Sequence, residues 1–254
     1  MVGSFLNCVI YRLEKRESFL QGRSHCPRCK HPLAWYDLIP LLSFIFLRRR
    51  CRYCRKPISW QYPIIETITG LLFLLIFNFQ FPIFNEFSIF NFQFLNLIYY
   101  LLIICFLVVI FVYDLKHFII LDKILIPAII ISLIYRTAGA LLLNNQLSIT
   151  NYLFSALGAA GFFGIIYLIS RGKWIGFADV KLAILPGLIL GWPGIILSLF
   201  LSFLIGGIMG VGLMVFSEKK LKSEIPFAPF LATGTLIALF WGQGLINWYF
   251  SLIF

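Results

Sequence analysis

The sequence predicts an all-α polytopic membrane protein with about seven full transmembrane helices. Of its 254 residues, 61% are hydrophobic, and the mean hydropathy is +0.94, whereas a soluble domain is usually about 45–50% apolar. The hydrophobic residues also gather in runs that short polar stretches separate. A chain this apolar cannot bury its surface in one water-soluble core, so we expect the lipid bilayer to be its solvent.

The predicted spans are seven apolar runs that follow the first sixty residues. A membrane helix needs about 20 residues, and the run Leu182–Leu190 has to borrow residues from its flanks to cross. An apolar stub at residues 1–11 is too short to cross alone and is interpreted as a truncated first helix. The seven runs are Pro63–Phe79, Leu95–Tyr113, Lys123–Leu143, Tyr152–Ser170, Leu182–Leu190, Ile195–Phe216 and Pro229–Phe250.

The distribution of charge predicts the orientation of these spans. The net charge is +11, and 12 of the 21 Lys and Arg residues lie within residues 12–56. Because basic residues favour the cytosolic side of a membrane, this pattern is better explained by topology than by nucleic-acid binding. Arg136, within the third predicted span, has to snorkel or pair. Basic stretches at 12–56, 114–123, 171–181 and 217–225 alternate with stretches without Lys or Arg at 80–94, 144–151 and 191–194.

Residues 12–61 form a polar domain, predicted to be cytosolic, that contains two C-x-x-C pairs 21 residues apart. Two such turns bring four thiolates into a tetrahedron, which is the geometry of a structural zinc site. A pair of disulfides is the alternative, but disulfides are rare in the cytosol. We therefore predict a closed zinc-knuckle site, with His25 and His31 as flanking surface residues rather than ligands. Its four ligands are Cys26, Cys29, Cys51 and Cys54.

Within the same domain, Leu38–Leu47 is an apolar patch that is too short to span a bilayer. We expect this patch to dock on the membrane face. The remaining residues, 62–254, are predicted to form the transmembrane domain.

Asp114 and Asp179 are the candidate catalytic residues. Asp114 ends the second predicted span and Asp179 precedes the fifth, so the topology places both at the cytosolic membrane edge. Acidic residues at membrane depth are costly and are commonly functional, and two neighbouring carboxylates can activate water. The alternative is that each aspartate caps a helix. The residues alone leave both interpretations open, while Asp122 is interpreted as a helix cap and Glu66 as a supporting residue or an arginine partner.

Ordered motifs along nearly the whole chain carry a resemblance to one known family. They are Gly3-Ser4-Phe5-Leu6-Asn7 with Tyr11-Arg12-Leu13, the two C-x-x-C pairs, Trp35–Leu41, Tyr62–Glu66, Asp114 followed by Asp122, Gly176–Lys181 and Pro226–Pro229. On these motifs the chain resembles the bacterial type IV prepilin peptidases, which are aspartic membrane proteases.

The resemblance implies an aspartic endopeptidase of the bacterial inner membrane, with its zinc domain and active site facing the cytosol. It implies Asp114 and Asp179 as the catalytic residues and the prepilins and pseudopilins of type IV pilus and type II secretion systems as substrates. Many family members also methylate the new N-terminus, which implies S-adenosylmethionine as a second cofactor. The lipid bilayer is an expected partner and nucleic acid is not.

Three departures from the family pattern motivate an alternative. The opening helix is a stub, Ala178 replaces the glycine before Asp179, and Ala228 replaces a glycine in the late motif. A methyl group at 178 is expected to oppose a loop with positive φ. The chain is then a catalytically weak or inactive relative that acts as a pilin-binding or assembly protein. A transporter with carboxylate ion sites is a third hypothesis, and the lack of inverted repeats weighs against it.

Overall fold

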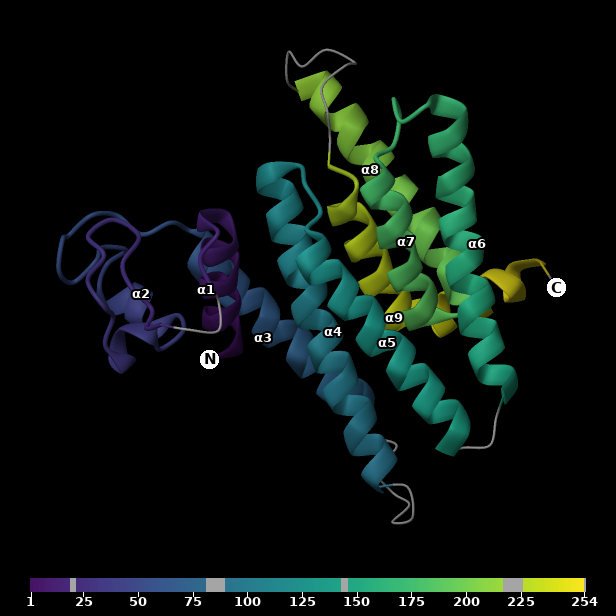
Figure 1. Cartoon of the computed structure of the whole chain (residues 1–254), viewed down its shortest axis with the longest axis horizontal. Coiled ribbons are helices and arrows are strands. Elements are labelled where there is room, and N and C mark those ends of the chain that lie inside the picture. The colour runs from purple at the N-terminus through teal and green to yellow at the C-terminus, as the bar shows by residue number, and fades with distance from the viewer. Residues whose placement is uncertain (19–21, 81–89, 143–145, 217–225, 254) are drawn as a thin grey trace. The chain divides into compact units, whose positions relative to one another are not determined.

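The chain is helical, as expected, in the computed structural model (Figure 1), which describes residues 1–18, 22–80, 90–142, 146–216 and 226–253. Within these ranges no sheet forms, and the only β pairings are isolated bridges in the two cysteine turns. The predicted stretch 217–225 and most of 80–94 lie outside the described residues. The helices are α1 (Val2–Lys15), η1 (Trp35–Leu38), α2 (Leu42–Phe46), α3 (Gln61–Gln80), α4 (Phe90–His117), α5 (Asp122–Leu142), α6 (Gln146–Ser170), α7 (Phe177–Leu190), α8 (Gly194–Phe216) and α9 (Ala228–Ile253).

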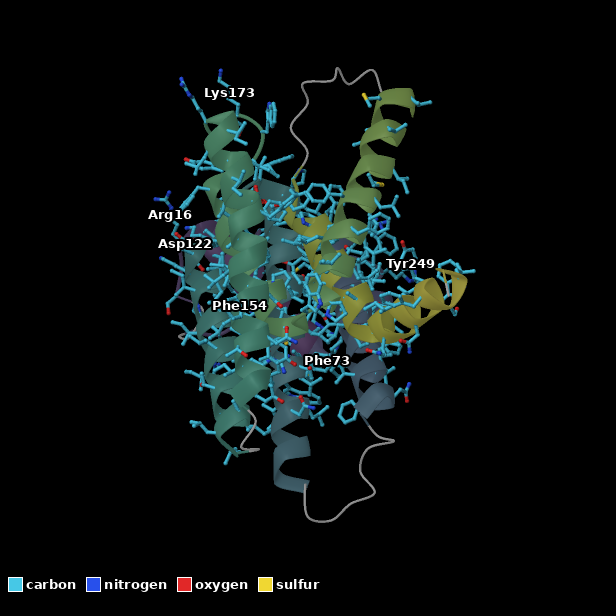
Figure 2. The ribbon with its side chains drawn as sticks, turned by 90° about the vertical axis from the view of Figure 1, so that its right-hand side faces the viewer. Arg16, Phe73, Asp122, Phe154, Lys173 and Tyr249 are labelled. Carbon is cyan, nitrogen blue, oxygen red and sulfur yellow. The ribbon has the colours of Figure 1, made fainter. Side chains whose placement is uncertain are left out.

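Six helices among the described residues are long and apolar enough to cross a membrane, namely α3, α4, α5, α6, α8 and α9. Apolar side chains project from them, and Phe154 on α6 is 75% exposed (Figure 2). The chain is therefore a multi-pass membrane protein. The fifth predicted run, Leu182–Leu190, does borrow residues from its flank, because α7 begins at Phe177. With 14 residues it is only about 21 Å long, whereas the hydrocarbon core is about 30 Å thick.

The chain divides into two compact units, Met1–Val109 and Ile110–Phe254, with the boundary inside α4. In the first unit α1 packs along α3. This helix continues past the expected stub to Lys15 and includes the buried Arg12. Its Gly3 allows the two backbones to meet, because a Cβ there would lie 2.7 Å from the Cα of Glu66.

In the second unit α7 is the central helix, since it packs against α5, α6, α8 and α9. Figure 1 shows α6 running alongside α7. Half of the residues of α7 are buried, from Leu182 to Ile189 with Ile184 as the exception. The contact with α6 depends on Gly187, because a Cβ at this position would lie 2.6 Å from the backbone N of Ala156.

Gly187→Ala is therefore expected to force α6 and α7 apart. Overpacking a core contact costs about 1–3 kcal/mol, so the melting temperature of the detergent-solubilised protein should fall. Gly158→Ala on α6 is the matched control, because nothing lies within 4 Å of a Cβ there. Equal melting temperatures for the two variants would contradict the close contact.

Candidate functional site

Two aspartates meet at one end of the second unit. Asp114 lies in the last turn of α4, and Asp179 is the third residue of α7. Their carboxylates are close enough to interact electrostatically, and Asp114 also interacts with the backbone amide of Ala228, the first residue of α9. The Asp114 side chain is buried, at 4% exposure. Three helix ends thus bring the two predicted candidates together.

Asp179 also takes part in a helix cap. The backbone N–H of Gly176 donates to the Asp179 carboxylate at 3.2 Å, and the Asp179 N–H donates to the Gly176 carbonyl at 3.1 Å. This reciprocal arrangement satisfies N–H groups that the first turn of a helix leaves unpaired. Capping and proximity to Asp114 are therefore compatible properties of the same side chain.

A pair of carboxylates at this distance has a defined chemical capacity. In general, two carboxylates in direct contact repel when both are ionised, so such a pair holds one proton between them. The ionised member can then accept a proton from water while the neutral member donates one to a substrate oxygen. The proton belongs to the pair rather than to one residue.

The two alanines that replace family glycines both occupy helical positions. Ala178 is the second residue of α7 and Ala228 the first of α9. Neither is among the residues with positive φ, and Ala228 is fully buried without displacing its helix. The absence of positive φ at Ala178 agrees with the expectation that its methyl group opposes such a conformation, and the effect of this residue on activity stays a prediction.

An ion pair beside the aspartates was not apparent from the sequence. Lys181 on α7 pairs with Asp122 in the first turn of α5, and its ammonium also lies 5.7 Å from the ring centre of Phe177. Asp122 is thus a bridge to α7 rather than only a helix cap. Glu66 has its own role in the first unit, where its carboxylate accepts a hydrogen bond from the Leu41 N–H at 2.9 Å.

Arg136 holds the opposite end of α7. Its guanidinium donates to the carbonyl of Leu188 at 2.9 Å and to the carbonyl of Ile189, which are orphan acceptors of the last helical turn. The guanidinium also lies 3.8 Å from the ring centre of Tyr152 on α6. A cation at a helix C-terminus is favourable. Of the two expectations for Arg136, snorkelling or pairing, the structure therefore shows pairing, with the end of α7.

Arg136→Met should leave two carbonyls at the end of α7 without their charged donor. Hydrogen bonds to charged groups contribute about 1.5–3 kcal/mol, so we expect the melting temperature to fall by about 4–8 °C. Thr137→Val, one residue further on, is the control, because the Thr137 hydroxyl bonds within its own helix to Ile134. A melting temperature for Arg136→Met that matches the control would exclude the contact.

The four predicted cysteines form one cluster in the first unit. Their Sγ atoms all lie within 4.8 Å of one another, and the Sγ atoms of Cys26 and Cys54 are 4.0 Å apart. All four are free thiols, which excludes the disulfide alternative in this structure. Four sulfurs placed at about 2.3 Å from zinc form a tetrahedron with edges of about 3.8 Å. The cluster therefore fits a zinc ion held by four thiolates.

The thiols of the cluster differ in their pKa values. Burial raises the pKa of Cys26, but hydrogen bonds from the backbone of Cys29 and Arg28 outweigh it and bring the pKa to about 7. Burial raises the pKa of Cys51. Cys26 therefore loses its proton readily, whereas deprotonation of Cys51 is unfavourable. A bound divalent cation would offset the free-energy cost of bringing four thiolates together.

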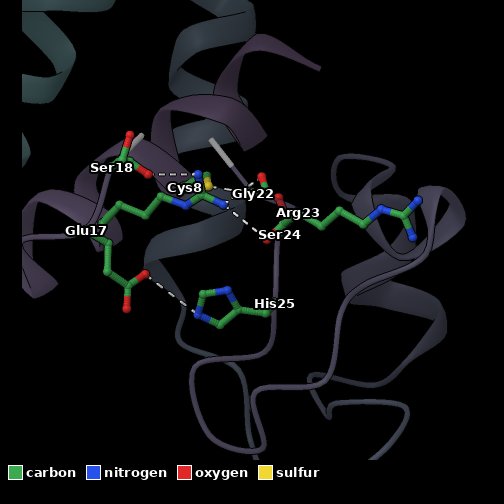
Figure 3. A network of polar contacts seen from close by, with 8 residues as sticks. Cys8, Glu17, Ser18, Gly22, Arg23, Ser24 and His25 are labelled. Carbon is green, nitrogen blue, oxygen red and sulfur yellow. Dashed lines mark hydrogen bonds and ion pairs between the residues drawn. The ribbon is translucent and has the colours of Figure 1, made fainter. Parts of the chain in front are cut away.

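Arg12 ties the first cysteine turn to α1 (Figure 3). Its guanidinium donates to the carbonyls of Ser18, Gly22 and Arg23 at 2.9–3.0 Å. The neighbouring His25 lies 3.9 Å from the Glu17 carboxylate. This histidine is not part of the cysteine cluster, as expected, but it is partly buried rather than a surface residue.

The purified protein should contain about one equivalent of zinc, by elemental analysis, because four thiolates close the coordination sphere. Cys51→Ser removes one ligand and should reduce this content strongly. Cys8→Ser should leave it unchanged, since Cys8 accepts a weak hydrogen bond from Ser24 and is not part of the cluster. A Cys51→Ser protein with full zinc content would show that the metal is held elsewhere.

Comparison with known proteins matches both halves of the chain. The profile of the bacterial peptidase A24 N-terminal domain matches residues 1–79, and that of the type IV leader peptidase family matches residues 101–211. A prepilin leader peptidase/N-methyltransferase of Aeromonas salmonicida is 30% identical over 100% of this chain and 91% of that protein. Proteins of the same name are 31% identical in Legionella pneumophila and 29% in Bacillus subtilis, over 98% and 99% of this chain and 90% and 95% of theirs. No solved structure matches the chain significantly.

Proposed function

Because the chain belongs to the type IV leader peptidase family, we propose that it cleaves the leader peptides of type IV prepilins and pseudopilins. Asp114 and Asp179 are the proposed catalytic residues. The observation that carries this proposal is the placement of Asp114 in the last turn of α4 and Asp179 in the first turn of α7, near enough for the Asp179 charge to act on Asp114. The relatives from Aeromonas salmonicida and Legionella pneumophila carry this activity in their names, and their similarity extends over almost the whole chain.

In the proposed reaction the ionised carboxylate takes a proton from water, and the resulting hydroxide attacks the carbonyl carbon of the last leader residue, a glycine. The protonated carboxylate donates its proton to the carbonyl oxygen, which forms a neutral tetrahedral diol. Collapse of this diol breaks the C–N bond, and the leaving amine takes a proton from the pair. The leader carboxylate and the pilin amine are the products, so one water is consumed.

The distribution of basic residues supports cleavage on the cytosolic side. Lys116 and His117 end α4, Lys123 lies in the first turn of α5, and Lys181 lies beside Asp179. These basic residues are at the same helix ends as the aspartates. The positive-inside bias supports the proposal that the carboxylate pair faces the cytosolic side of the inner membrane.

The cysteine cluster has a structural role in this proposal. Cys26, Cys29, Cys51 and Cys54 would hold zinc and lock the polar domain, because no ligand position remains for substrate. The name of the relatives also implies methylation with S-adenosylmethionine. Among the described residues we identify no group that fits this cofactor, and we derive no methyl-transfer step.

A catalytically inactive relative that binds pilins is the competing hypothesis, and the geometry does not favour it. It was motivated by the short opening helix and by Ala178 and Ala228, and the two alanines occupy ordinary helical positions. A helical alanine is more favourable than glycine by about 1 kcal/mol, so these replacements are not evidence of lost activity.

Asp179→Asn separates catalysis from capping. The Asn oxygen can still accept the Gly176 N–H, so a residue that only caps α7 should tolerate this change. A catalytic carboxylate should not, and we expect Asp114→Asn and Asp179→Asn each to reduce cleavage at least about 1000-fold. The measurement is the intact mass of a co-expressed prepilin, with membrane accumulation of each variant checked in parallel.

Asp122→Asn is the matched control for these variants. It removes a carboxylate from the same end of the unit but breaks only the pair with Lys181. This variant should therefore still cleave the prepilin, at a lower rate than the unmodified protein. Full cleavage by Asp179→Asn would overturn the catalytic assignment, as would equal losses in all three variants.

A further inference from the structure

An apolar loop in the cysteine domain presents large side chains to its surroundings. We define the interfacial loop as residues 38–50, which include α2. Leu42, Ile45 and Phe46 are 52%, 67% and 80% exposed. Full exposure of such side chains to water costs about 1.5–3 kcal/mol each relative to burial. Three of them at one tip indicate that the tip does not lie in water.

The loop is fixed against the start of the first membrane helix. The Leu41 N–H donates to Glu66 of α3 at 2.9 Å, and α3 is a candidate membrane span from Gln61 onward. Glu66 lies about 7.5 Å along the helix from that residue. The loop thus lies beside the first turns of the span rather than beyond its end.

Internal contacts hold the tip in this position. Phe44 is the buried residue of the loop, and its ring packs against that of Trp60 at 5.3 Å. The Arg49 guanidinium lies 4.8 Å from the ring centre of Trp60, and the Arg49 N–H donates to the Phe44 carbonyl at 3.0 Å. Because Phe44 faces inward, Leu42, Ile45 and Phe46 face outward.

Three consecutive arginines, Arg48, Arg49 and Arg50, follow the apolar tip directly, and all are exposed. Trp35 and Trp60 are also exposed, and tryptophan is enriched where a membrane meets water. An apolar tip next to clustered guanidinium groups matches the boundary between acyl chains and phosphates. The positive charge selects anionic lipids over a basic peptide.

We propose that the interfacial loop inserts Leu42, Ile45 and Phe46 into the headgroup–acyl boundary of the bilayer, while Arg48 and Arg50 bind phosphates of anionic phospholipids. This lipid contact fixes the cysteine domain to the membrane surface at a second point besides α3. It goes beyond the proposed cleavage reaction and does not depend on it.

The first test measures depth in the full-length protein in nanodiscs. A fluorescent amino acid replaces Phe46 in one variant and the exposed Lys56 in another. We expect a lipid with a quencher high on its acyl chain to quench position 46 about threefold more than position 56, and aqueous iodide to show the reverse. The proposal would be overturned if iodide quenched position 46 as strongly as position 56. It would also be overturned if the acyl-chain quencher had no greater effect at position 46, because the loop would then contact a protein partner rather than lipid.

The second test measures charge recognition. The double variant Arg48→Gln/Arg50→Gln should bind phosphatidylglycerol at least about fivefold more weakly by native mass spectrometry, since each basic residue at the surface contributes to binding anionic lipid. Lys15→Gln/Lys56→Gln removes the same charge from exposed residues outside the loop and should retain the affinity. Equal affinities for the two double variants would overturn the assignment of the phosphate contacts, and zinc content reports whether each variant is folded.

Discussion

The length of α7 is the constraint on which the second unit depends. A helix of 14 residues is about 21 Å long, which is shorter than the hydrocarbon core. With its start at the cytosolic membrane edge, as proposed, its far end lies within the hydrocarbon core, where unpaired backbone groups are costly unless protein surrounds them. The four helices that pack on α7 provide this environment, and Gly187 permits the closest of these contacts. A short helix can be central only because it does not face lipid alone.

Both ends of α7 have specific partners. At its start, Gly176 and Asp179 pair through their backbone and side chain, and Lys181 joins α5 through Asp122. At its end, Arg136 binds the last carbonyls. These contacts restrict both the translation of α7 along its axis and its lateral displacement. The position of Asp179 next to Asp114 follows from this fixation, so the far end of α7 contributes to a site that it does not touch.

The sequence predicted the features that depend on local pattern. The cysteine spacing indicated the zinc-binding cluster, and runs of apolar residues indicated the spans, including the short run at Leu182–Leu190. Helix-end positions predicted that Asp114 and Asp179 lie at one membrane edge, and this stays a prediction. Sequence motifs could not show the Lys181–Asp122 pair or the Leu41–Glu66 hydrogen bond, because each joins segments that only folding brings together. The consequence of Ala178 for activity stays a prediction, because its helical position in α7 does not test it.

The most direct test of this account is the density around α7 in an electron cryomicroscopy map of the full chain in a lipid nanodisc. The account predicts a helix from Phe177 to Leu190, with Arg136 on its last carbonyls and the Asp179 carboxylate facing that of Asp114. A helix that continues through Gly191 to the opposite membrane surface, or an Asp179 side chain directed away from Asp114, would contradict it.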